Sequence, residues 1–176
     1  MVDFLHAPYA ATVAAGRWTL DPTRSSVEFR VPHFFGLITV KGRFTRFEGS
    51  LDLRGDTPMA TLTVHAASLE SRHARRDAHL RSDDFFAVER HPQIWFVSDE
   101  AALDGPRLSL SGELHAAGRH TRVTTEATLV DHGDEIEIAA TAHVDQRGLG
   151  MTWSPLGMVR TPAELTLRGR LVRADA

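Results

Sequence analysis

The chain has 176 residues, a length that fits one domain and allows a sizeable hydrophobic core. Hydrophobic residues make up 42% and charged residues 24% of the sequence, and the formal net charge of -3 provides no overall positive field to hold nucleic acid. Because the sequence contains no cysteine, disulfides, thiolate nucleophiles and cysteine-based metal sites are excluded.

The N-terminal segment does not resemble a targeting sequence. It begins Met1-Val2-Asp3 and lacks the positive start and the apolar run (about 7–15 residues) of a secretory signal. No stretch approaches the roughly 18 consecutive apolar residues of a membrane-spanning helix. We expect a soluble, cytoplasmic protein with a flexible tail over residues 1–16 and one domain over residues 17–176. A mature form whose signal had been removed is the alternative.

Beyond the tail, apolar residues alternate with other residues in short runs. In residues 59–66, Ala60, Leu62, Val64 and Ala66 are expected to face one way and the residues between them the other. The same period of two recurs in residues 27–31, 108–114, 123–129, 136–144 and 165–171. Turn signals containing glycine separate these runs. Short strands joined by tight turns predict an all-β domain, either a sandwich or a barrel.

Two segments break this alternation. Residues 68–86 predict a helical or loop insertion, with a short helix over residues 77–81. Ser82, Asp83 and Asp84 offer capping side chains for a further turn through Phe85 and Phe86. Connections of this length inside a compact domain are often functional. Residues 146–160 are rich in Gly, Met, Trp and Pro, and we expect a bent strand and loop there.

Several motifs follow one another along the chain: Trp18–Pro22, Ser25–His33, Val40–Gly49, Arg75–Phe86, His91–Ser98, Gly112–Val123 and Arg147–Met151. In this order, from Trp18 to Val172, they resemble the YceI-like family of polyisoprenoid-binding, lipocalin-like proteins. The sequence departs from that family at Leu149, where an aromatic residue is usual, at Pro32 and in residues 151–158. Many members of the family are exported.

The resemblance decides between the two architectures. It implies a single antiparallel β-barrel of about eight strands, which binds and carries or sequesters a long-chain amphiphilic lipid: a polyisoprenoid, a polyprenyl diphosphate or an isoprenoid quinone. It implies no other cofactor and favours a homodimer. A barrel of this size can hold one small ligand or be filled by side chains. Small inward residues such as Ala60, Ala66, Ala127, Ala140, Ala142, Gly112 and Gly169 favour a cavity. A filled barrel acting as an interaction module is the alternative.

The expected lining of the lumen consists of large apolar residues near these motifs: Phe29, Phe35, Phe44, Phe47, Phe86, Trp95, Phe96, Leu114, Met151 and Trp153. Adjacent residues of a strand face opposite ways, so Trp95 and Phe96 cannot both point inward. For each of these residues, ordinary core packing is the alternative role.

The basic segment within residues 68–86 is a candidate head-group site. Arg76, His79 and Arg81 lie close together in sequence, and arginine binds phosphate oxygens bidentately. They are therefore candidates for holding a diphosphate head group. The alternative is structural, because Asp77, Asp83 and Asp84 could pair with the same arginines and close the loop.

Catalytic and metal sites are not indicated by the sequence. Its ten histidines do not form the His-Glu-x-x-His spacing of a zinc site, and the sequence has neither a Gly-x-Ser-x-Gly elbow nor a phosphate-binding glycine loop. We expect a binding protein without metal. The alternative is a small lipocalin-like enzyme that acts on a hydrophobic substrate, which would need convergent polar groups deep in the lumen.

Overall fold

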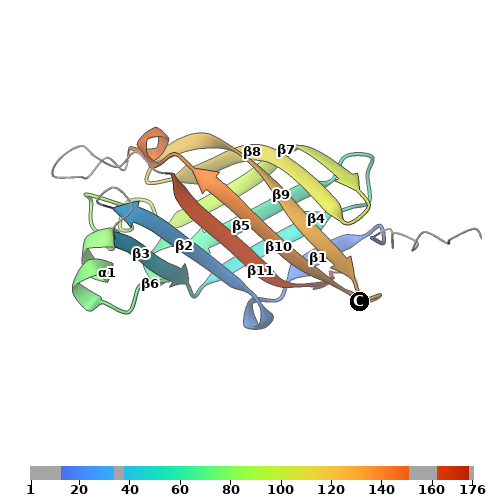
Figure 1. The fold of residues 1–176 in the computed structure, drawn as a ribbon, viewed down its shortest axis with the longest axis horizontal. Helices are drawn as coiled ribbons and strands as arrows, with labels where there is room; N and C mark the ends of the chain where they lie inside the picture. Colours follow the sequence, from blue (N-terminus) through green and yellow to red (C-terminus); the bar gives the residue numbers. More distant parts are fainter. Residues whose placement is uncertain (1–12, 34–37, 151–161, 175–176) are drawn as a thin grey trace, which may run out of the picture.

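The computed structural model describes residues 13–33, 38–150 and 162–174, and it confirms the predicted antiparallel barrel. Figure 1 shows an elongated barrel with α1 (Ala74–Arg81) at one end. The strands are β1 (Arg17–Leu20), β2 (Ser26–His33), β3 (Ile38–Phe44), β4 (Phe47–Asp52), β5 (Met59–His65), β6 (Leu69–Glu70), β7 (Gln93–Asp104), β8 (Arg107–Ala116), β9 (Arg119–Asp131), β10 (Glu135–Val144) and β11 (Ala163–Arg173). The 3-10 turns are η1 (Pro22–Arg24), η3 (Ala66–Ser68) and η4 (Gln146–Leu149).

Eight of these strands form a closed ring. Their hydrogen-bonded order is β1-β4-β5-β7-β8-β9-β10-β11, and β11 pairs back to β1 where Leu20 lies opposite Leu171. The remaining strands extend the wall toward α1, because β11 also pairs with β2, β2 with β3 and β3 with β6. Closure satisfies the edges that an open sheet would expose.

The period of two places one face of each long strand inside the barrel. In β10, Ile136, Ile138 and Val144 are buried, whereas Glu137 and Ala139 are exposed. In β8, every second residue from Leu108 to Ala116 is buried. Apolar residues at alternate positions can face only one side of a pleated strand, so the inward set predicted from the sequence forms the core.

The end of the barrel opposite α1 is filled by large side chains. Trp18, Leu108 and Ile136 are fully buried there. The Trp18 indole N–H donates to the carbonyl of Ala14 (3.3 Å), and the Arg173 guanidinium lies 4.6 Å from the ring centroid of Trp18. These contacts close this end.

Part of the segment predicted as a flexible tail takes part in this packing. Val13 is buried in the core, and the backbone N–H of Ala14 donates to Asp131 Oδ2 (3.1 Å). Residues 1–12 lie outside the described residues. The barrel domain therefore begins to pack by Val13, a few residues before the predicted boundary.

The insertion after β5 contains the expected helix, which is longer than predicted. The helix α1 begins at Ala74, and His73 caps it by accepting the backbone N–H of Arg76 at Nδ1 (3.2 Å). The buried carboxylate of Asp77 accepts the backbone N–H of Ser71 (2.9 Å) and the Ser71 hydroxyl, which ties α1 to the chain before it. The sequence signal was weak because α1 lacks an apolar stripe: among its residues only Asp77 and Leu80 are buried.

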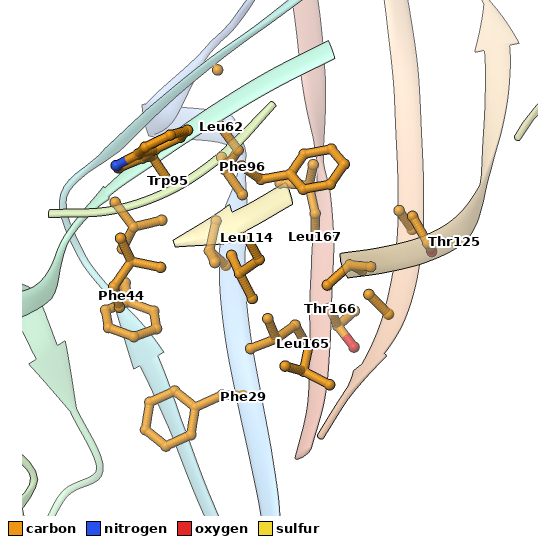
Figure 2. Close-up of a pocket in the computed structure, with 18 of the residues that line it drawn as sticks. Phe29, Phe44, Leu62, Trp95, Phe96, Leu114, Thr125, Leu165, Thr166 and Leu167 are labelled. Carbon is orange, nitrogen blue, oxygen red and sulfur yellow. The ribbon is translucent and has the colours of Figure 1, made fainter. Parts of the chain in front are cut away.

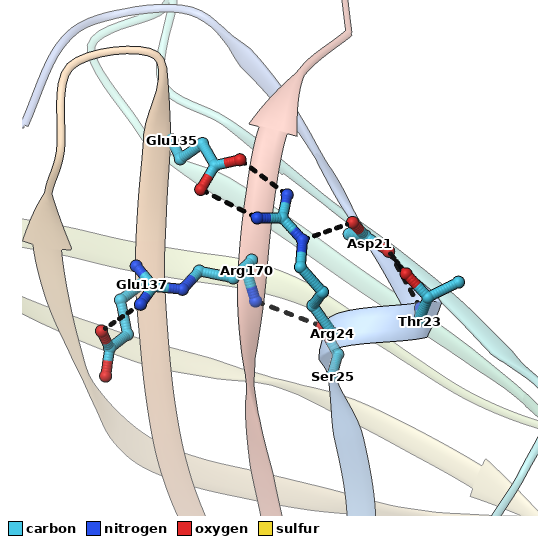
Figure 3. A network of polar contacts seen from close by, with 7 residues as sticks. All are labelled: Asp21, Thr23, Arg24, Ser25, Glu135, Glu137 and Arg170. Atoms are coloured by element: carbon cyan, nitrogen blue, oxygen red, sulfur yellow. Dashed lines mark hydrogen bonds and ion pairs between the residues drawn. The ribbon is translucent and has the colours of Figure 1, made fainter.

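A polar network holds the junction of β1 and β2 against the neighbouring strands (Figure 3). The Arg24 guanidinium binds Glu135 of β10 (2.6 Å) and Asp21 (2.7 Å). The backbone N–H of Arg170 donates to the Ser25 hydroxyl (3.2 Å). A Cβ at Gly169 would lie 2.1 Å from that hydroxyl oxygen, so a residue without a side chain is needed for this close approach.

This network predicts a specific acid sensitivity. Hydrogen bonds from Thr23 and then Arg24 lower the pKa of Asp21 to about 2, and Arg24 also lowers the pKa of Glu135. Since the folded pKa of Asp21 is below its ordinary value, its contribution to stability is present above about pH 4 and is lost as the pH falls toward about 2. Arg24→Ala should lower the stability at neutral pH, and the deficit should shrink over that pH window.

The measurement is urea unfolding of both proteins at a series of pH values, with Arg168→Ala of β11, an exposed arginine, as the matched control. A deficit that stays constant down to about pH 2 would contradict the role assigned to Arg24.

Candidate functional site

The barrel encloses an elongated apolar cavity of about 190 Å³ (Figure 2). Each strand of the closed ring contributes lining residues, among them Leu20, Leu51, Leu62, Phe96, Leu114, Val123, Ile138 and Leu167. The fully buried Trp18, Leu108 and Ile136 are not part of the lining and close the barrel beyond one end of the cavity. An engineered apolar cavity of roughly 150 Å³ stays dry and binds benzene, so a cavity of this kind favours hydrocarbon over water.

Toward α1, aromatic rings form the wall of the cavity. The Phe29 and Phe44 rings lie 5.4 Å apart, the Phe44 and Phe86 rings 6.1 Å apart, and the Phe86 and Phe85 rings 5.3 Å apart. Phe86 reaches this row because its backbone N–H donates to the carbonyl of Leu80 in α1 (3.0 Å). The insertion after β5 therefore supplies two of the four rings at this end of the cavity.

Small side chains provide the empty space in the middle of the barrel. Ala60, Ala127, Ala140 and Ala142 line the cavity, as the sequence predicted. Ala66, Gly112 and Gly169 do not line it. At Gly112, for example, a Cβ would lie 2.1 Å from the Val97 carbonyl oxygen, so this glycine allows neighbouring strands to approach closely.

The polar groups near the cavity are engaged by the protein itself. Among the described residues that line it, none is Asp, Glu, Lys, Arg or His. The Thr125 hydroxyl donates to the carbonyl of Thr141 (2.7 Å). The buried Ser98 hydroxyl accepts the backbone N–H of Ala60 (2.8 Å). The cavity thus offers a ligand almost entirely apolar contacts.

Most of the predicted lining residues border the cavity. Phe29, Phe44, Phe86, Trp95, Phe96 and Leu114 are among the residues around it, Phe47 is buried in the core without bordering it, and Phe35, Met151 and Trp153 lie outside the described residues. Although Trp95 is among the residues around the cavity, its ring lies on the outer face, where it is 37% exposed and stacks on His115 at 3.6 Å. Phe96 takes the inward position, in agreement with the expected alternation.

The predicted head-group residues contact the protein near α1. Arg76 donates to the Ser71 hydroxyl (2.8 Å) and to the Ser71 carbonyl (2.6 Å). Arg81 donates to the carbonyls of Ala67 (3.0 Å) and Leu69. His79 lies within α1, where its carbonyl accepts the Ser82 hydroxyl (2.6 Å).

These arginines therefore hold the segment around α1 together, as in the structural alternative. Their hydrogen-bond partners are a hydroxyl and backbone carbonyls, and not the aspartates that the sequence suggested. Asp77 binds Ser71, and Asp83 pairs with Arg90 (3.2 Å). The Asp77 carboxylate and the Ser71 hydroxyl are both hydrogen-bonded to neighbouring groups of this segment. They therefore fix the segment without being left unpaired themselves, which would cost stability.

Sequence reasoning missed the aliphatic half of the lining. Leu62, Val123, Ile138, Leu165 and Leu167 border the cavity from β5, β9, β10 and β11. The alternation already placed each of them on an inward face, so that signal could have identified them. The expected lining consisted mainly of large aromatic residues near the motifs and did not include these aliphatic side chains.

A glycine determines the position of one aromatic wall residue. Phe29 of β2 lies opposite Gly42 of β3, and a Cβ at Gly42 would lie 2.3 Å from the Phe29 ring and 2.9 Å from the Glu70 carbonyl oxygen. Gly42→Ala should push this ring into the cavity, lower the stability by about 1–3 kcal/mol and weaken ligand binding several-fold. Thermal unfolding and titration with a fluorescent fatty acid would measure the two effects.

Gly55→Ala is the matched control, because a Cβ there would meet only the Thr57 carbonyl oxygen at 4.0 Å. It should change stability by no more than about 0.5 kcal/mol. If Gly42→Ala changes stability and ligand binding as little as Gly55→Ala does, the close contact between Gly42 and the Phe29 ring does not determine the position of that ring.

Metal-binding groups and membrane-spanning helices are absent from the described part of the chain. There, no group of three or more His, Cys, Asp or Glu side chains is arranged to hold a metal ion. None of the helices in residues 13–33, 38–150 and 162–174 is long and apolar enough to cross a membrane.

Comparison with known proteins agrees with this geometry. The profile of the YceI-like domain matches residues 18–171. The protein YceI of Escherichia coli O157:H7 is 36% identical over 131 residues, covering 72% of this chain and 68% of that protein. A UPF0312 protein of Pectobacterium carotovorum is 31% identical over 137 residues, covering 76% and 71%.

Solved structures share the fold at low identity. Burkholderia cenocepacia BcnA superposes with a TM-score of 0.76 at 18% identity, covering 86% of this chain and 98% of that chain. A polyisoprenoid-binding domain from Saccharophagus degradans, implicated in plant cell wall breakdown, superposes with a TM-score of 0.71 at 13% identity, covering 89% and 98%. At these identities the likeness establishes the architecture.

Proposed function

The chain belongs to the YceI-like family, and from this premise we propose that its barrel binds a long-chain amphiphilic lipid and carries or sequesters it. The proposed ligands are a polyisoprenoid, a polyprenyl diphosphate or an isoprenoid quinone. The observation that carries this proposal is the apolar cavity that runs along the barrel and is closed at one end. A polyisoprenoid-binding neighbour with the same fold supports it.

Energetics favour a hydrocarbon chain in this cavity. Each CH₂ group moved from water into apolar surroundings contributes roughly 0.8 kcal/mol, so a few isoprene units supply most of the affinity before ordering costs are subtracted. Because the lining residues carry no charge, no part of the cavity wall can neutralise a buried phosphate. The tail would therefore lie inside the barrel and the head group outside it.

The closed end determines how the lipid would be oriented in the cavity. Trp18, Leu108 and Ile136 fill the barrel beyond one end of the cavity, so the tail would point toward them and enter from the α1 end. The aromatic row of Phe29, Phe44 and Phe86 would contact the part of the chain nearest to the head group.

An enzyme that uses the same cavity is the second candidate function, and the lining argues against it. General acid–base catalysis needs a titratable group within hydrogen-bond reach of the reacting atoms. No such group lines the cavity among the described residues, and the nearby hydroxyls of Thr125 and Ser98 are already hydrogen-bonded to the backbone. A binding role therefore accounts for the site better than catalysis.

Native mass spectrometry of freshly purified protein tests the proposal, followed by organic extraction of what is bound. We expect a mass increment that matches a polyisoprenoid or quinone, and delipidated protein should take up such a lipid again. A protein that carries no lipid and takes up neither polyprenyl diphosphates nor quinones would overturn the proposal.

A further inference from the structure

The histidines of this protein are distributed unevenly along the barrel. Of the ten in the sequence, His6 lies outside the described residues and His132 lies in the turn after β9, at the closed end. The other eight lie in the half of the barrel toward α1, near strand ends or in and beside α1: His33, His65, His73, His79, His91, His115, His120 and His143. Histidine is the side chain whose ordinary pKa places its charge change between about pH 5 and 8.

A stacked cluster beside the β8–β9 turn presents some of these histidines to solvent. The exposed Trp95 ring stacks on His115 (3.6 Å), and the His115 ring stacks on His120 (5.1 Å). The His91 ring packs over the turn itself, because a Cβ at Gly118 would lie 2.6 Å from its Cε1 atom. We call Trp95, His91, His115 and His120 the rim cluster.

Most carboxylates around the rim cluster are already paired, so they would not fully neutralise a positive charge on its histidines. Arg119 follows the turn and is exposed, with its side chain close to Gly150. Glu113 lies 3.1 Å from His115, whereas the carboxylates of Asp99 and Glu100 on β7 are occupied by Arg122 (2.9 and 3.4 Å).

Other charged groups of the neighbouring elements form ion pairs, while Asp84 and Glu89 on the loop after α1 are exposed and contribute negative charge on the segment before His91. On the loop after α1, Arg90 binds Asp83, and at the end of β10 Arg147 binds Asp145 (3.0 Å). His143 lies 3.8 Å from Glu164, which also faces Arg30 (4.0 Å). Protonation of the histidines would therefore add net positive charge at this end, whereas at the closed end the one histidine among the described residues is His132, which lies 3.6 Å from Glu137.

We propose that the α1 end of the barrel, through the rim cluster, docks on the surface of an anionic phospholipid bilayer when mild acidification charges its histidines. Charge complementarity identifies the occupant: anionic membranes attract nearby cationic side chains, and an exposed tryptophan is typical of the membrane interface. Docking would turn the cavity toward the bilayer, so that a hydrocarbon chain could transfer without crossing water. The direction of transfer rests on the proposed lipid-binding function, whereas the docking itself does not.

Vesicle flotation tests this proposal with the full chain. Vesicles of phosphatidylcholine alone are compared with vesicles containing about 30% phosphatidylglycerol, at about pH 5.5 and about pH 7.5. Binding to the anionic vesicles should be at least about tenfold stronger at the lower pH, absent for phosphatidylcholine alone and lost in roughly 0.5 M salt.

Two variants assign the effect to the rim cluster. The triple change His91→Gln, His115→Gln and His120→Gln should reduce binding at the lower pH to the level of the unchanged protein at the higher pH. His132→Gln, at the closed end, is the matched control and should bind normally. Circular dichroism at both pH values confirms that each variant is folded.

The outcomes separate docking from lipid carriage. Ala140→Phe, which fills the cavity, should still dock, because docking does not require a bound lipid. If the unchanged protein docks but neither carries nor takes up a lipid, that result would contradict the proposed function alone. Binding that does not depend on pH, binding to phosphatidylcholine alone, or equal losses for the triple variant and His132→Gln would overturn the docking proposal.

Discussion

Ala140→Phe is expected to abolish lipid binding while leaving the protein folded. Ala140 lies on β10 and lines the middle of the cavity, opposite Ala127 of β9 and Leu167 of β11 in the strand register. A phenyl ring there would occupy space for about six ligand carbons. At roughly 0.8 kcal/mol per carbon, the affinity should fall at least about 100-fold. Displacement of a fluorescent polyene fatty acid by a polyisoprenoid would measure this loss.

Ala139→Phe provides a control on the same strand. Ala139 is adjacent to Ala140 but exposed on the outer face, so the same substitution there adds equal bulk outside the barrel. Ala139→Phe should leave the lipid affinity within about twofold of that of the unchanged protein. Neither variant should lower the free energy of unfolding by more than about 3 kcal/mol. Equal losses at both positions would show that the ligand does not occupy the cavity.

Trp18→Ala is expected to cause a large loss of stability. The Trp18 side chain is fully buried at the closed end, donates its indole N–H to Ala14 and lies beneath the guanidinium of Arg173. Removing a buried tryptophan costs about 3–5 kcal/mol, because both transfer energy and packing are lost. For a domain of this size the melting temperature should fall by roughly 6–20 °C, measured by differential scanning calorimetry.

Two further substitutions keep this test informative if Trp18→Ala does not fold. Trp18→Phe retains most of the apolar volume and should lose less than half as much stability. Val130→Ala on β9 removes an exposed apolar side chain and should shift stability by no more than about 0.5 kcal/mol. A Trp18→Ala protein as stable as Val130→Ala would contradict the role of Trp18 in closing the barrel.

The walls of the barrel could be predicted from the sequence because the period of two is a local property of each strand. The inward set of β10, from Ile136 to Val144, could be identified in this way, and the structure confirms it. The same signal showed that Trp95 and Phe96 face opposite sides of the sheet, but it could not decide which of the two faces inward; the structure places Phe96 inward. Closure of the sheet required the family resemblance, since sandwiches and barrels alternate alike.

The sequence could not show features that depend on contacts between distant residues. β11 pairs with β2 along its first part and with β1 along its last part, and the chain breaks between β1 and β2 where this change occurs. No local sequence pattern marks the position of that change. Likewise, the closed end requires Trp18, Leu108 and Ile136, far apart in the chain, to meet at one level of the barrel. The partners of Arg76 and Arg81 were also unpredictable, because backbone carbonyls carry no sequence signal.

The location of the ligand's hydrocarbon chain can be measured directly by photo-crosslinking. A polyisoprenoid probe with a diazirine at the end distant from its head group is bound to the protein, irradiated and mapped by peptide mass spectrometry. Adducts should fall on lining residues near the closed end, such as Leu51, Leu110 and Leu171, and should disappear in Ala140→Phe. Adducts confined to exposed residues such as Met59 or Val130, unchanged in that variant, would contradict a lipid inside the barrel.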